Sequence, residues 1–132
     1  MKYKFKNNKG NMLVLVCAAL PVFIGIIGVC LDGSLVIYNQ TKLMAATKFA
    51  ALSASSYNTV IEEKTIINAT EDQARSALVE NFSGATLRSF SINSASKNKC
   101  TVIAETDVNF VFMKVFGINS KKISESYTVT RK

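Results

Sequence analysis

The chain has 132 residues and a formal net charge of +7, and 48% of its residues are hydrophobic. A positive mean hydropathy and a charged fraction of only 19% exclude a disordered polar chain and favour a single ordered domain. Because the sequence contains no histidine, catalytic triads with histidine, histidine-containing zinc sites and imidazole acid–base chemistry are excluded.

The first element is an apolar run from Met12 to Leu31 that carries no charged residue. At a rise of about 1.5 Å per residue, a helix of this length matches a hydrocarbon core roughly 30 Å thick. The sequence therefore predicts a transmembrane helix over 12–31. Pro21 removes one backbone hydrogen bond and predicts a kink, and Gly25 and Gly28 are positions of close approach or flexibility.

The segment 1–11 that precedes this run is basic and contains no acid. Its four lysines are Lys2, Lys4, Lys6 and Lys9. The positive-inside rule places this end in the cytoplasm and the C-terminal part outside, in the periplasm or at the cell exterior. A cleaved secretory signal is the alternative, but the run exceeds the usual apolar region of about 7–15 residues, which favours an uncleaved single-pass anchor.

Residues 32–56 contain no proline, and their apolar side chains recur close to helical spacing, so they predict an extension of the helix beyond the membrane. One side of this extension carries mostly alanines, whose small side chains would let another helix approach closely. These alanines pack either on the protein's own outer domain or on neighbouring copies. Asp32 is either a solvated boundary residue or the partner of a basic group on another protein. The candidate packing residues are Asp32, Tyr38, Ala45, Ala46, Ala50, Ala51 and Ala54.

Residues 57–132 predict a small outer α+β domain. Thr70 and Gln73 form a capping-box pattern that predicts a helix from Thr70 to about Glu80, and Gly84 ends this region. Three segments with alternating or β-branched residues follow, and the polar stretch between the first two is typical of a hairpin turn. The sequence thus predicts a three-stranded antiparallel sheet with strands at 86–93, 100–108 and 123–130, and a turn at 94–99.

An aromatic run occupies Phe110–Ile118, between the second and third predicted strands, and Gly117 closes it. It fits a strand or a short helical turn. We interpret its phenylalanines as a plug under the sheet, with a hydrophobic patch for a partner as the alternative.

The charged residues and cysteines do not indicate an enzyme. The acidic pairs Glu62-Glu63, Glu71-Asp72 and Glu105/Asp107 supply neither a metal cluster nor a nucleophile with a base, so we expect no catalytic site, metal or cofactor. Basic residues outside the membrane do not cluster with aromatics, so we expect no nucleic-acid binding. Cys100 is interpreted as an apolar packing residue, with an intermolecular bridge as the alternative.

The order of these features resembles the TadE/TadG-like proteins, the pseudopilin-like subunits of the Tad (Flp) pilus system. The similarity rests on Leu31-Asp32-Gly33, Tyr38 and the alanine block at 43–54, all in register, and on the final segment from the aromatic run to Tyr127. Gly10 corresponds to the glycine that precedes the processing point in pilins. The fifth residue after it is Leu15 rather than the glutamate of processed pilins, which favours a minor subunit that stays in the membrane.

The resemblance implies a pilin-like fold and a minor structural or assembly subunit of a bacterial surface pilus, which contributes to adhesion or biofilm formation. The implied partners are the cytoplasmic membrane, other pilin-like subunits and pilus assembly proteins, in a homo- or hetero-oligomer. Residue physics alone supports a broader alternative, a single-span membrane-anchored envelope binding module.

Overall fold

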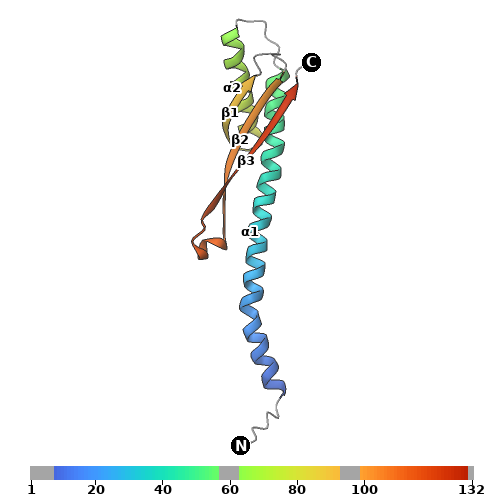
Figure 1. The fold of residues 1–132 in the computed structure, drawn as a ribbon, viewed down its shortest axis with the longest axis vertical. Coiled ribbons are helices and arrows are strands. Elements are labelled where there is room, and N and C mark those ends of the chain that lie inside the picture. Colours follow the sequence, from blue (N-terminus) through green and yellow to red (C-terminus); the bar gives the residue numbers. More distant parts are fainter. Residues whose placement is uncertain (1–7, 57–62, 93–98, 131–132) are drawn as a thin grey trace, which may run out of the picture.

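A long helix and a small antiparallel sheet make up the fold, as seen in a computed structural model that describes residues 8–56, 63–92 and 99–130. Figure 1 shows the first helix as a long shaft, with the other elements gathered beside its C-terminal half. This arrangement confirms the predicted α+β class with a long N-terminal helix and a three-stranded antiparallel sheet. The elements are α1 (Asn8–Ser56), α2 (Glu63–Asn81), β1 (Thr86–Ile92), β2 (Lys99–Asn109), the 3-10 helix η1 (Met113–Phe116) and β3 (Ser120–Thr130).

The apolar run and the predicted extension form one helix, α1, of 49 residues. At about 1.5 Å per residue it is about 70 Å long, and it continues through Pro21 without interruption. Among the described residues α1 is the one helix long and apolar enough to cross a membrane. Only 6% of the most apolar stretch of α1 is buried by the rest of the protein. This apolar part of α1 is therefore not the core helix of a globular domain.

Helix α2 begins at Glu63, so the predicted start at Thr70 is wrong. No glycine or proline lies between these two residues, and the backbone therefore continues the helix toward its N-terminus past the capping-box pattern. The side of α2 that faces the rest of the protein includes Ala74 and Leu78, which are both fully buried.

The three strands pair in the order β1-β2-β3, antiparallel throughout, at nearly the predicted positions. The central strand β2 alternates between buried and less buried residues, which is the pattern of a sheet with one face on a core. The register of β1 against β2 shifts between Leu87 and Ser89, at an irregularity of the edge strand. Most of the predicted turn at 94–99 lies outside the described residues.

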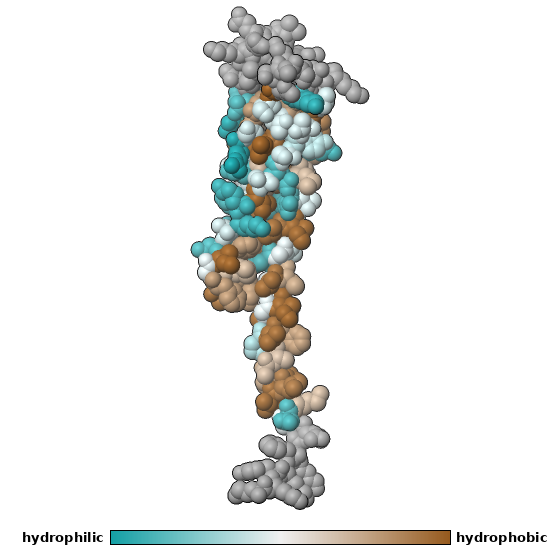
Figure 2. Space-filling model, viewed as in Figure 1, coloured by the Kyte–Doolittle hydropathy of each residue, from teal (hydrophilic) through white to brown (hydrophobic). Residues whose placement is uncertain are grey.

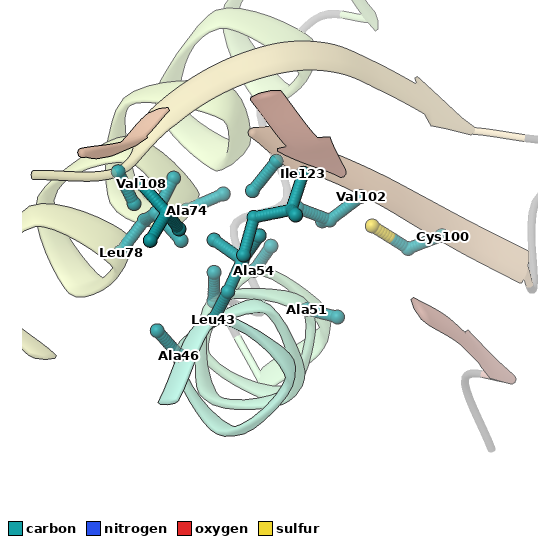
Figure 3. Close-up of a cluster of buried hydrophobic side chains, with 13 residues drawn as sticks. Leu43, Ala46, Ala51, Ala54, Ala74, Leu78, Cys100, Val102, Val108 and Ile123 are labelled. Carbon is teal, nitrogen blue, oxygen red and sulfur yellow. The ribbon is translucent and has the colours of Figure 1, made fainter. Parts of the chain in front are cut away.

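The core lies where the second half of α1 meets α2 and the inner face of the sheet (Figure 3). The α1 side of this core consists mostly of alanines, and small side chains let a helix approach its neighbours closely. Cys100 is buried in β2, so its sulfur is not accessible for a bridge to another chain. The labelled core residues are Leu43, Ala46, Ala51 and Ala54 of α1, Ala74 and Leu78 of α2, and Cys100, Val102, Val108 and Ile123 of the sheet.

Candidate functional site

The loop that joins β2 to β3, Phe110–Asn119, lies beside the middle of α1, and we call it the tip loop (Figure 1). The backbone N–H of Phe110 donates to the carbonyl of Asn119 at 2.9 Å and closes the loop at its base. Within it, η1 ends at Gly117, which has a φ of 81°. This left-handed conformation favours glycine, and it lets the N–H of Ile118 reach the carbonyl of Met113 at 3.1 Å.

Asp32 of α1 binds the start of the tip loop through three hydrogen bonds. Its Oδ1 accepts the backbone N–H of Val111 at 2.9 Å. Its Oδ2 accepts the N–H of Phe112 at 2.9 Å and that of Met113 at 2.6 Å. These donors lie at the first residue of η1, Met113, and at the two residues before it, so the carboxylate caps a short helix that belongs to a distant part of the chain.

The Asp32 side chain is almost completely enclosed, with 2% of its surface exposed. Asp32 is the first residue after the apolar segment 12–31. Burial alone would raise the pKa of this carboxyl, but the three backbone N–H donors and the nearby positive charge of Lys114 lower it, and the net pKa lies below its ordinary value. Asp32 is therefore held as a carboxylate, which hydrogen bonds from the backbone of the tip loop and the nearby charge of Lys114 stabilise.

One turn before Asp32, Gly28 accepts the ring of Phe112 against the helix backbone. A Cβ atom at position 28 would overlap with the Phe112 ring, whereas a Cβ at Gly25 would meet nothing. Residues four apart lie on the same side of a helix, so Gly28 and Asp32 form one receptor surface for the loop. This close approach agrees with the expectation for Gly28, and the partner is a segment of the same chain.

Most apolar side chains of the tip loop point away from the protein. Val111, Val115 and Phe116 are 72%, 78% and 67% exposed, and Ile118 is 45% exposed. The interpretation of the aromatic run as a plug under the sheet is therefore wrong for most of its length; only Phe110 is buried. The run is a short helical turn, one of the two conformations that its sequence fits, because a carboxylate outside the strand pair caps its first N–H groups.

The predicted packing residues separate into three groups. Asp32 is neither solvated nor shown against a basic side chain of a partner; its acceptors are taken by backbone N–H groups of the tip loop. Tyr38 and Ala45 are exposed. The other four are buried in the chain's own core, so their surfaces are already covered within one chain: Ala46, Ala50, Ala51 and Ala54.

Four of the exposed residues of α1 beyond Asp32 form a stripe on the side of the helix that is turned away from the core. Its members recur at helical spacing and are at least partly apolar. We call this the outward stripe, and it consists of Tyr38, Ala45, Phe49 and Leu52. Lys48 stands beside it, with its Nζ 6.0 Å from the centre of the Tyr127 ring, so this lysine contacts the chain's own sheet.

The acidic pair Glu105/Asp107 belongs to the outer face of the sheet. Glu105 lies 3.8 Å from Arg88 of β1 and 3.5 Å from Lys122 of β3, which makes a cross-strand row of charges. Asp107 is exposed, and its partner in the register is Lys122. Within the ranges 8–56, 63–92 and 99–130, no group of three or more cysteine or acidic side chains is arranged to hold a metal ion.

The backbone donors of the tip loop are the part of the site that sequence reasoning missed. Every non-proline residue has the same N–H group, so no residue type marks Val111, Phe112 or Met113 as partners of a carboxylate. The available signal was the pairing of an acid with a glycine one turn earlier at the end of an apolar run.

Comparison of the chain with protein-family models, with curated proteins and with solved structures gives no match.

Proposed function

We propose that this protein is a minor pilin-like structural or assembly subunit of a Tad/Flp-type bacterial surface pilus. In this proposal the first half of α1 anchors the chain in the cytoplasmic membrane, with the N-terminus in the cytoplasm and the sheet outside. The observation that carries it is the continuity of α1. One helix has an exposed apolar half and a second half that holds a small antiparallel sheet.

Such a helix suits a subunit that is inserted in a bilayer before assembly and then associates laterally with other long helices. The exposed apolar half of α1 needs lipid or other apolar helices around it. Without them, side chains such as Phe23 and Ile27 would have more than half of their surface in contact with water. In a filament of related subunits the same half would be covered by neighbouring helices.

The outward stripe is the surface that we assign to contacts with other subunits outside the membrane. Phe49 and Tyr38 are 56% and 63% exposed and face away from the core. Their rings give large apolar contact area, and Ala45 between them leaves room for a facing side chain. The buried alanines of α1 play no direct part in these contacts and instead hold the sheet on the helix.

Deletion of the gene in its host, followed by complementation, tests the proposal. Surface filaments are sheared from the cells and counted by electron microscopy, and the complementing chains are wild type, Phe49→Lys and Val79→Lys. Val79 is a matched control because it is an exposed apolar residue on α2, 47% accessible. Loss of filaments on deletion, with restoration by wild type and Val79→Lys but not by Phe49→Lys, is the expected result.

Filament numbers that are unchanged by deletion would overturn the pilus assignment. Equal restoration by both lysine variants would instead overturn the assignment of the outward stripe. Membrane fractionation of each variant verifies that the three chains are inserted at the same level.

A further inference from the structure

We infer that the tip loop is an interfacial membrane anchor, which inserts its exposed apolar side chains into the outer surface of the bilayer that α1 crosses. The inference needs only that α1 spans a membrane, so it stands or falls separately from a role in a pilus. It adds a second lipid contact to a chain whose other lipid contact is the helix itself.

The height of the loop relative to the apolar segment supports this inference. Phe112 lies on Gly28, and Gly28 precedes the end of the charge-free run at Leu31 by about 4.5 Å along the helix. Asp32 binds the backbone of the loop at the first residue beyond that run. The loop is thus fixed at the boundary between the hydrocarbon core and the headgroups.

The chemistry of the exposed side chains fits that location. Val115 and Phe116 of η1 are 78% and 67% exposed, although they belong to an ordered, hydrogen-bonded loop. Figure 2 shows hydrophobic residues along the lower half of the shaft and on the hairpin tip beside it. An apolar patch that continues the apolar surface of a membrane helix is covered by the same bilayer.

The charges around the loop favour anionic lipid. Phe110–Lys122 contains no acidic residue, and its basic side chains Lys114 and Lys121 are exposed, whereas Lys122 pairs with Glu105 of β2. Lysines beside an inserted apolar patch extend their ammonium groups to the headgroup phosphates while their alkyl chains lie along the apolar surface. A water-facing protein partner would require neither this position nor this charge bias.

Tryptophan fluorescence tests the inference, because the chain has no native tryptophan. Full-length Phe116→Trp is reconstituted in vesicles of phosphatidylcholine and phosphatidylglycerol, with bromine-labelled acyl chains as the quencher. Val115→Trp is a second reporter in case one ring disturbs the loop. Val79→Trp is the control, because α2 packs on the half of α1 beyond Asp32. Phe82, which directly follows the end of α2, contacts Lys42 of α1, and Lys42 lies about 16 Å beyond Leu31 along the helix. A tryptophan at position 79 should therefore lie outside the bilayer.

We expect blue-shifted emission and strong bromine quenching at positions 115 and 116, with little of either at position 79. The quenching at 116 should weaken when phosphatidylglycerol is omitted or when Lys114→Gln and Lys121→Gln are introduced. Emission at 116 that matches position 79 would overturn the inference. So would protection at 116 that rises with protein density but is insensitive to bromine, since another protein chain would then cover the loop.

Discussion

A 2.6 Å hydrogen bond joins the Met113 backbone N–H to the Asp32 carboxylate and attaches the tip loop to the end of the apolar half of α1. The two residues are 81 positions apart in the chain. Together with the bonds from Val111 and Phe112, this contact extends the attachment of the sheet along α1 well beyond the alanine-rich core. The position of the tip loop therefore depends on α1 as much as on the strands that carry it.

Replacement of Gly28 by alanine should displace the tip loop, because the new Cβ would overlap with the Phe112 ring. We expect faster proteolysis of the detergent-solubilised protein at Lys114, which is in the loop. Gly25→Ala is the matched control and should leave the cleavage rate unchanged, since its Cβ would meet no atom.

The double variant Gly28→Ala/Phe112→Ala separates steric overlap from a general effect on the helix. Removal of the ring makes room for the new methyl group, so cleavage at Lys114 should be no faster in the double variant than in Phe112→Ala alone. An added increase in the double variant would contradict the assigned contact.

Leucine at position 50 should destabilise the outer domain, because Ala50 is fully buried among closely packed elements. Overpacking of this kind costs about 1–3 kcal/mol in the free energy of unfolding. Ala45→Leu adds the same side chain at an exposed position and should change the free energy by about 0.5 kcal/mol or less. Urea unfolding in detergent, followed by circular dichroism, measures the difference, and equal effects would argue against the assigned core.

Alternating side chains made the sheet predictable. Along β2 the inward positions include Val102 and Ala104, whereas Thr101 and Glu105, which flank this pair, face the other way, and this alternation identifies the strand locally. The long helix was equally predictable, because an uncharged run of this length has few other stable conformations.

The alanine face shows where sequence reasoning stops. Small residues at helical spacing suit packing on the same chain and packing on another chain equally well, so only the fold distinguishes Ala50, which is buried, from Ala45, which is exposed. The prediction of the start of α2 was wrong for a related reason. A capping pattern at Thr70 does not mark the N-terminus of a helix when the residues before it also tolerate helical geometry.

Gly117→Ala should loosen the C-terminal end of η1, because residue 117 has a φ of 81°. A Cβ in this left-handed conformation costs about 1–2 kcal/mol. We expect a lower thermal unfolding midpoint for Gly117→Ala and a smaller decrease for Gly117→Asn, since asparagine tolerates this conformation better. Similar midpoints for wild type and the alanine variant would contradict the assigned turn.

Hydrogen exchange at the amides of Val111, Phe112 and Met113 tests most directly whether Asp32 holds the tip loop on α1. In the full-length protein in micelles, these three amides should be protected. Asp32→Ala should accelerate their exchange by about tenfold or more while leaving Val102 and Ala104 in β2 unchanged. Asp32→Asn, which keeps one acceptor oxygen, should give an intermediate rate. Rapid exchange at all three amides in the wild type, or rates that Asp32→Ala does not alter, would contradict the account.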